Sequence, residues 1–186
     1  MKVKEVLAEA AFLLGDETLF AALNESTASS DKETAKRADD LLKCYNLVLH
    51  ETAVNYLPIR KTASLKGGKI EYSSLEFPVL NIAGVYDKNG VAVKYKTFPS
   101  YFVTAAEEIT VVYDVVPADA ASEDDFPYAA TRIGKYTFAC GIACEYCLLT
   151  GRYTEAGNFN QKYRAGAEGL PVRRGRIIKE RRNWGL

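Results

Sequence analysis

The stretch that most constrains the fold runs from residue 128 to residue 169, where two patterns of helical period flank Gly151. Apolar residues that recur every three or four positions mark one buried helix face. The first pattern comprises Ile133, Tyr136 or Thr137, Cys140, Cys144, and Cys147 or Leu148. The second comprises Tyr153, Ala156, Phe159, Tyr163 and Ala167. Because glycine supplies the positive φ that helix C-termini favour, Gly151 predicts a turn, and the stretch predicts an antiparallel helical hairpin. The small residues Gly134, Ala139, Gly141 and Ala143 would let another helix approach closely.

The first 58 residues have the same helical character. An amphipathic helix over residues 3–14 should end at Gly15, and a short second helical segment should follow from Asp16. Ser30 or Asp31 can cap a long helix, which Pro58 ends because the residue before a proline is pushed out of the helical region. The apolar face of this long helix comprises Ala38, Leu41, Leu42, Tyr45, Val48, Leu49, Thr52 and Tyr56.

From residue 59 to residue 117 the pattern changes to short alternating stretches rich in β-branched residues. Asn89-Gly90 predicts a hairpin turn between strands at 82–86 and 91–95, and Lys66-Gly67-Gly68 predicts another turn. Residues 101–103 and 109–113 should add a further hairpin. Pro117 closes this module, and residues 118–127 form an acidic loop that leads into a helix at Tyr128.

These elements predict a mainly α, α+β fold. A helical bundle carries a small antiparallel β module, inserted between the long helix and the C-terminal hairpin. The expected single domain covers residues 1–169, with a helical core at 1–58 and 128–169 and a β insertion at 59–117. A chain of 186 residues can bury such a core. No apolar run approaches the length of a membrane span and no secretory signal opens the sequence, so we expect no membrane association and reduced thiols.

Charge is distributed unevenly, although the formal net charge is zero. Residues 97–131 hold seven carboxylates and no Lys or Arg, whereas basic residues predominate from Arg132 onward. Residues 170–186 are predicted to form an extended basic arm, because Pro171 and two glycines interrupt it. Its candidate partner-binding residues are Arg173, Arg174, Arg176, Lys179, Arg181, Arg182 and Trp184. Guanidinium groups pair well with carboxylates or phosphates, and an aromatic anchor such as Trp184 is typical of an interface hot spot.

The cysteines at 140, 144 and 147 form a C-x3-C-x2-C pattern with Tyr146 before the last one. This pattern resembles the cluster-binding motif of radical S-adenosylmethionine enzymes, in which three thiolates hold an iron–sulfur cluster. That motif needs a loop to wrap the cluster, whereas these cysteines lie at helical spacing. The sequence favours core cysteines, since cysteine behaves as a small hydrophobe when buried.

Other chemistry-bearing groups are sparse. His50 is the single histidine and has no visible partner for a triad or a zinc site, so a structural role is expected. Gly67-Gly68 lacks the lysine pattern of a phosphate loop. Asp39-Asp40 is interpreted as a solvated helix face, and Glu123-Asp124-Asp125 as a cluster at a helix N-terminus. The prediction is therefore a protein without catalytic residues, metal or cofactor.

The order of elements resembles that of the head–tail connector proteins of tailed bacteriophages, also called adaptor or head-completion proteins. The late-helix motif that carries the resemblance is Glu145-Tyr146-Cys147-Leu148-Leu149-x-Gly151-x-Tyr153-x-Glu155-Ala156-x-x-Phe159-x-x-x-Tyr163. Many such proteins end in a basic stretch with tryptophan, and here Arg181-Arg182-Asn183-Trp184 matches it. Gln161-Lys162-Tyr163 departs slightly from the commonest Lys-x-Tyr form.

The resemblance implies a structural virion protein that forms a ring, usually of twelve copies, beneath the portal. Such a ring joins head to tail, extends the DNA channel without binding DNA specifically, and presents a docking surface to a tail or stopper protein. It would lie at the neck of the virion after assembly in the host cytoplasm. The C-terminal arm would engage the portal, and acidic and basic faces would pack head-to-tail between copies.

Two alternatives remain from the sequence. One is a nucleic-acid-binding module that uses the basic arm, with an affinity that falls steeply as salt rises. The other, more remote, is an iron–sulfur enzyme built on the C-x3-C-x2-C motif.

Overall fold

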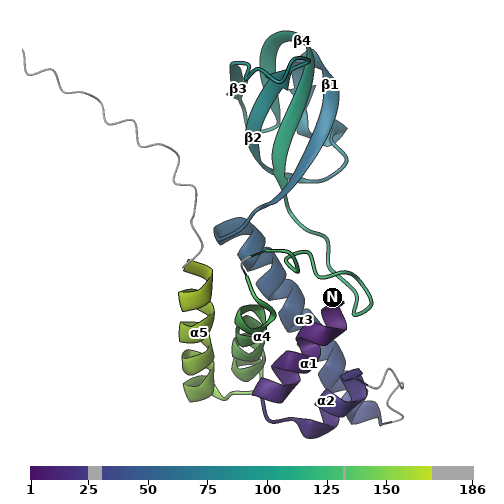
Figure 1. Cartoon of the computed structure of the whole chain (residues 1–186), viewed down its shortest axis with the longest axis vertical. Coiled ribbons are helices and arrows are strands. Elements are labelled where there is room, and N and C mark those ends of the chain that lie inside the picture. The colour runs from purple at the N-terminus through teal and green to yellow at the C-terminus, as the bar shows by residue number, and fades with distance from the viewer. Residues whose placement is uncertain (25–30, 132, 169–186) are drawn as a thin grey trace, which may run out of the picture.

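The computed structural model describes residues 1–24, 31–131 and 133–168, which form a helical body and a β lobe above it (Figure 1). The helices of the body are α1 (Val3–Leu13), α2 (Glu17–Asn24), α3 (Lys32–Asn55), α4 (Lys135–Leu149) and α5 (Tyr153–Glu168). The lobe holds β1 (Ile59–Glu71), a 3-10 turn (Tyr72–Ser74), β2 (Val79–Asp87), β3 (Tyr95–Thr97) and β4 (Tyr101–Val115). The predicted class, mainly α with an inserted antiparallel β module, is therefore confirmed.

Helix α4 lies at the centre of the helical body, where it packs on α1, α3 and α5. Its buried residues are Phe138, Ala139, Cys140, Gly141, Ile142, Ala143, Cys144, Tyr146 and Cys147. The sequence pattern predicted a single buried stripe on α4, and this prediction was wrong, because a helix that is apolar on most sides is enclosed rather than amphipathic. The predicted turn at Gly151 is confirmed, since this residue has a φ of 77°.

The close approach of helices at Gly141 is also confirmed. A Cβ atom added there would lie 2.9 Å from Val48 Cγ1 of α3 and 3.1 Å from the Tyr163 ring of α5. The Tyr163 hydroxyl in turn makes a buried hydrogen bond of 2.9 Å with the Thr52 hydroxyl of α3. Because Gly141 has no side chain, α3 and α5 can contact each other across the central helix.

The long helix α3 begins after Asp31, whose carboxylate accepts hydrogen bonds from the N–H groups of Glu33 and Thr34. Asp31 rather than Ser30 is therefore the N-cap.

Asp16 caps α2 in the same way, because its carboxylate accepts a hydrogen bond from the N–H of Leu19 at 3.0 Å. Partial burial raises the pKa of Asp16, but hydrogen bonds from Leu19 and Thr18 together with the charge of Arg37 outweigh it and leave the pKa below its usual value. Because Arg37 of α3 lies 2.6 Å from Asp16, this carboxylate also ties α2 to α3.

The segment between β4 and α4, residues 116–134, is a connector that crosses the helical body. Phe126, Tyr128 and Ile133 are buried in the same core as α1, α3 and α4. The prediction that a helix begins at Tyr128 was wrong, because Tyr128 is fixed by its ring in the core and by a 2.9 Å hydrogen bond from its hydroxyl to the Leu57 carbonyl. Helix α4 begins seven residues later, after Gly134 as N-cap.

The lobe is an antiparallel sheet in which β4 pairs with β1 along its length, with β2 beside its second half and with β3 beside its first. The core of the lobe is separate from that of the helical body and is built around Phe102, Val111, Tyr113 and Val85. Pro58 separates α3 from β1, so the lobe rises directly from the end of the long helix (Figure 1).

Two predictions of turns in the lobe were wrong. Residues 101–103 and 109–113 belong to one continuous strand, β4, rather than to a hairpin. Lys66-Gly67-Gly68 does not reverse the chain but marks a shift of register within β1. A Cβ atom on Gly67 would lie 1.5 Å from the Ala106 carbonyl oxygen, so glycine is required where β4 crowds this irregularity. The Asn89-Gly90 turn is present, with a φ of 78° at Gly90, but residues 91–94 after it make only a single bridge, between Tyr86 and Ala92.

We expect Gly141→Ala to destabilise the protein by about 1–3 kcal/mol, because the added methyl group overpacks the meeting point of α3, α4 and α5. Gly157→Ala in α5 is the matched control. No atom lies within 4 Å of the Cβ position at Gly157, so the better helix former should stabilise the protein by about 0.5–1 kcal/mol. Urea denaturation measures both values. Equal effects of the two substitutions would contradict the close approach at Gly141.

Candidate functional site

The residues predicted to bind a partner lie outside the described part of the chain. This holds for all seven: Arg173, Arg174, Arg176, Lys179, Arg181, Arg182 and Trp184. Candidate sites within the described residues, 1–24, 31–131 and 133–168, are therefore sought among charged, thiol-bearing and apolar groups.

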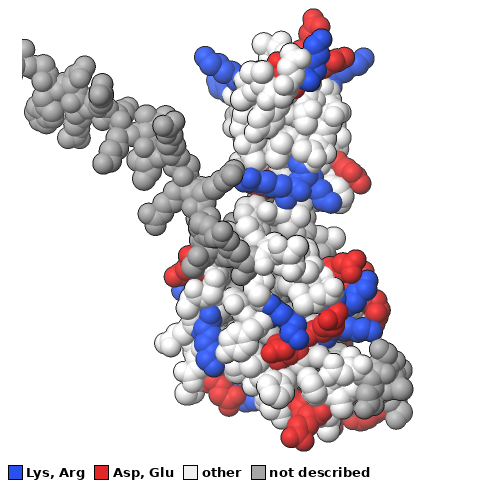
Figure 2. Space-filling view, viewed as in Figure 1, with Lys and Arg blue, Asp and Glu red and all other residues white. Residues whose placement is uncertain are grey.

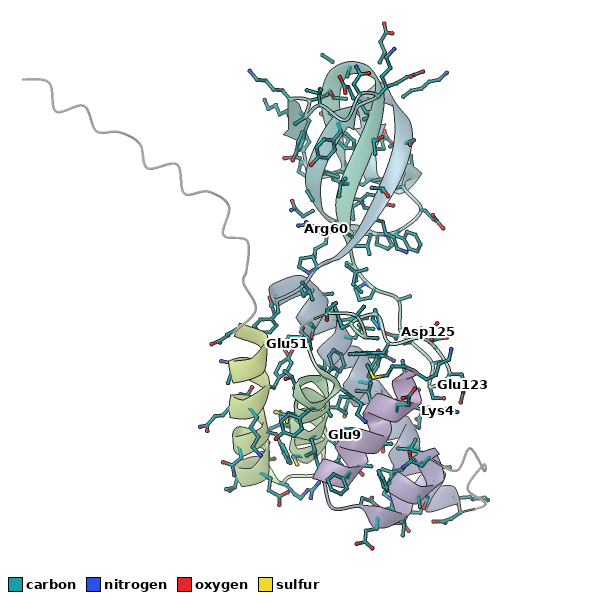
Figure 3. All side chains as sticks on the ribbon, viewed as in Figure 1. Lys4, Glu9, Glu51, Arg60, Glu123 and Asp125 are labelled. Atoms are coloured by element: carbon teal, nitrogen blue, oxygen red, sulfur yellow. The ribbon has the colours of Figure 1, made fainter. Side chains whose placement is uncertain are left out.

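The acidic connector binds the start of α1. Its backbone carbonyls at Asp124 and Ser122 each accept a 2.9 Å hydrogen bond, from the N–H groups of Val3 and Lys4. These are N–H groups that a helix leaves without an internal partner. Lys2 and Lys4 add ion pairs to Asp125 and Glu123 at 2.9 and 3.3 Å. Figure 3 shows Lys4, Glu123 and Asp125 together at this corner of the helical body.

Asp114 and Asp119 of the acidic stretch also lie close to basic side chains within the chain. Asp114 is buried at the base of the lobe and lies 3.0 Å from the Arg60 guanidinium. Asp119 Oδ1 lies 3.2 Å from His50 Nε2, although their geometry makes no hydrogen bond. The uneven distribution of charge along the sequence suggested one acidic docking face. In the structure, four of the seven carboxylates of residues 97–131 instead lie within ion-pair distance of a basic side chain of the same chain. On the face shown in Figure 2, basic and acidic side chains accordingly lie beside one another on the helical body.

The cluster Glu123-Asp124-Asp125 does lie at a helix N-terminus, as predicted, but the helix is α1 and not the one that follows in sequence. Asp39 and Asp40 form the expected solvated helix face, where both pair with Lys43 at 2.6 and 3.3 Å. Exposed pairs of this kind contribute little to the stability of the fold.

All four cysteines are buried and free. Burial raises the pKa of each thiol, to about 12 for Cys44 and about 11 for Cys144, with a smaller part from the negative charge of Glu145 in both cases. Cys140, Cys144 and Cys147 lie within the continuous helix α4, and Cys140 packs into a different cluster from Cys144 and Cys147. The prediction that these residues are core cysteines is confirmed.

A carboxyl pair that sequence reasoning missed lies between the helices. The pKa of Glu145 in α4 is raised by half-burial and, to a lesser extent, by the charge of Glu51 in α3. Glu51 points from α3 toward the side of the body where α5 lies (Figure 3). The two residues are 94 positions apart, so only the packing of α3 on α4 brings them together.

A polar hollow of about 520 Å³ lies where the end of α1, the start of α2 and the α4–α5 turn meet. Arg37, Asp16, Tyr146, Thr150 and Arg152 line it. Both arginines that line it are already paired, Arg37 with Asp16 at 2.6 Å and Arg152 with Glu155 at 3.2 Å. These ion pairs thus connect the elements that form the walls of the hollow.

Within the described ranges, no group of three or more His, Cys, Asp or Glu side chains is placed to hold a metal ion. Among the helices of those same ranges, none has the length and apolar character needed to cross a membrane.

An apolar edge lies at the α4–α5 turn and consists of Leu148, Leu149 and Tyr153. These side chains are 45, 62 and 72% exposed. They belong to the motif Glu145–Tyr163, of which other members, Tyr146, Cys147 and Tyr163, are buried. The helical pattern assigned Tyr153 to a buried stripe, and that assignment was wrong, because Tyr153 follows the turn at Gly151 directly and lies past the end of the core. Of the two alternatives Cys147 and Leu148, the structure buries Cys147.

Comparison with models of known protein families and with curated proteins finds no match to this chain.

Because burial raises the pKa of the four thiols, we expect them to stay protonated near neutral pH and to react with a thiol reagent only as the protein unfolds. In the unfolded chain the thiols ionise near pH 8.5. The stability that they contribute is therefore complete below that pH and is lost as the pH rises toward 11–12, the folded values of Cys144 and Cys44. Labelling kinetics with and without urea measure the first effect, and urea titrations from pH 8 upward measure the second.

Replacing Cys140, Cys144 and Cys147 together by Ala or Val should cost on the order of a few kcal/mol. The variant should keep its helical circular dichroism. Rapid labelling of the folded wild-type protein, or stoichiometric iron after reconstitution, would contradict the assignment of these residues to the core.

Proposed function

We propose that this chain is a structural virion protein that forms a ring below the portal of a tailed bacteriophage and joins the head to the tail. The sequence motif at Glu145–Tyr163 and the basic terminus with Trp184 support this proposal. The order of elements that carried the resemblance is now seen as a helical body with a β lobe inserted between α3 and α4.

The observation that carries the proposal is the apolar edge at the α4–α5 turn. The motif places three large apolar side chains, Leu148, Leu149 and Tyr153, where the chain's own core does not cover them. Exposed apolar groups within a contiguous stretch mark an interaction site. In the proposed ring, this edge packs against a neighbouring copy. Since most carboxylates of residues 97–131 are paired internally, the ring contact is apolar at this edge rather than an acidic face against a basic one.

The basic arm supplies the second contact in this proposal. Arg181 and Arg182 pair with carboxylates of the portal, and Trp184 fills an apolar pocket. One arm binds weakly, but the copies of a ring raise one another's effective concentration, so many weak arms attach firmly. The ring continues the DNA channel and offers its far side to a tail or stopper protein.

Leu149→Asp with Tyr153→Asp should abolish assembly, because two charges would be buried between copies without partners. The helical circular dichroism should be unchanged, since both side chains are exposed in the single chain. Val91→Asp in the lobe is the matched control, because Val91 is 61% exposed and lies far along the chain from this edge. Analytical ultracentrifugation and electron microscopy of the protein mixed with portal rings report assembly. Normal rings from the double variant would remove the main support for the proposal.

Truncation after Gly169 should leave a folded, soluble protein that no longer joins heads. The reason is that residues 170–186 hold the six basic side chains and the tryptophan of the proposed portal contact. Binding to portal rings, measured by co-sedimentation, should fall to background. If the truncated protein bound portals at normal strength, the arm would not be the docking element.

A further inference from the structure

One outer face of the β lobe carries a regular array of lysines and aromatic rings. The pairing register places Lys69 of β1, Val103 of β4 and Lys96 of β3 in one row across three strands. The alternate residues Ile70 and Phe102 are buried in the lobe, so this row faces outward. Phe98 and Tyr101 form the next row, where the N–H of Phe98 donates to the Tyr101 carbonyl at 2.8 Å.

The side chains of these two rows form a ladder. The rings of Phe98 and Tyr101 stack with centroids 4.6 Å apart and planes 17° from parallel. Lys69 Nζ lies 4.6 Å from the Tyr101 centroid, and Lys96 Nζ lies 5.2 Å from the Phe98 centroid. The stacked rings thus hold two ammonium groups in place, which lowers the side-chain entropy that a ligand would have to remove.

A shallow groove of about 400 Å³ adjoins the ladder. Tyr95, Val103 and Ala105 contribute apolar surface to it, and Lys94 and Lys96 add positive charge. Glu71 is a carboxylate beside the ladder and is paired with Lys69 at 3.3 Å. Glu107 and Glu108 follow Ala105 in β4 and line a second hollow with Asp87, Lys88 and Asn89.

We propose that this face, the lysine ladder of Lys69, Lys94, Lys96, Phe98 and Tyr101, binds single-stranded nucleic acid without regard to sequence. The three ammonium groups contact successive phosphates, and the groove takes the apolar face of a sugar or base. Apolar floors beside positive charges are the surfaces that single strands use. The proposal goes beyond the ring function and does not depend on it.

The chemistry of the face favours a nucleic acid over an acidic protein. Lysine is depleted from protein–protein interfaces, whose centres are apolar and poor in charge. Here lysines occupy both sides of the row, and Val103 between them, 38% exposed, is the large exposed apolar side chain of that row. Lysine acts as a point charge that suits phosphate, whereas pairing with carboxylates favours the planar fork of arginine.

The test is the salt dependence of binding to a fluorescein-labelled oligothymidylate about 20 nucleotides long, followed by fluorescence anisotropy with the full chain. The K69Q/K94Q/K96Q variant should lower the slope of log K against log salt by about 2, since each phosphate contact on a single strand contributes about 0.7. The affinity at 0.1 M salt should fall on the order of 100-fold for the same reason. The K69R/K94R/K96R variant, which keeps the charges, should retain the slope.

The matched control is K36Q/K61Q/K162Q, which removes three charges elsewhere and includes two lysines that also lie over rings, Lys61 over Phe77 and Lys162 over Phe159. All these variants keep the basic residues of 170–186, so the difference between the two glutamine variants isolates the ladder. Equal losses of slope in both would overturn the proposal. It would equally fail if an acidic peptide of the same net charge bound as tightly as the oligonucleotide and lost as much affinity in K69Q/K94Q/K96Q, because that result assigns the face to protein.

Discussion

The enclosure of α4 is the constraint on which the rest of the helical body depends. This helix contributes residues to both cores of the body, the large one with Phe138 and the small one with Cys144 and Cys147. Its neighbours α1, α3 and α5 each have an exposed side, so none of them could replace it as the centre. Small side chains on α4 set how near the neighbours come, and Gly141 allows the contact that brings Tyr163 to Thr52. Packing at α4 therefore fixes the direction in which α3 leaves the body, and with it the place of the lobe.

The connector, residues 116–134, links the lobe to the helical body and is itself fixed by contacts with that body. It leaves β4 at the base of the lobe, caps α1 with its carbonyls, buries Phe126 and Tyr128, and then enters α4. The amide of Asn46 in α3 holds it at Ala120 through hydrogen bonds in both directions, at 2.9 and 3.3 Å. Its carboxylates look in sequence like a surface for a partner. In the fold the carboxylates of Asp125 and Glu123 serve the chain itself, because they form ion pairs with Lys2 and Lys4 beside the start of α1.

The sequence predicted those helix ends and turns that neighbouring residues determine. It did not predict the features that depend on contacts between segments far apart in the chain. The start of α3 after Asp31, one of the two caps that the sequence offered, its end shortly before Pro58, and the turn at Gly151 followed from capping, proline and glycine rules. The start of α4 did not, because Tyr128 has helical spacing but is held by Leu57, 71 positions away. The sequence also could not show that β4 is one strand, because residues 105–108 interrupt its alternating pattern. This interruption lies opposite the shift of register in β1, where Gly67 leaves room for the backbone of Ala106. The lysine ladder was missed for the same reason, although Lys94, Lys96 and Phe98 alternate; its other half comes from β1 and β4.

The two proposed surfaces lie outside the cores of the helical body and of the lobe. Leu149 and Tyr153 project past the end of the core at the α4–α5 turn, and the ladder lies on the outer face of a sheet whose inner face, with Ile70 and Phe102, already completes the core of the lobe. Neither surface is needed to bury the apolar side chains around it. An isolated chain would expose this apolar area and this group of lysines for no gain in its own stability, which is the pattern expected when the missing contacts come from other molecules. In the two proposals the helical body and the lobe bind different partners, one apolar and one polyanionic, while the connector holds the two parts in a single structure.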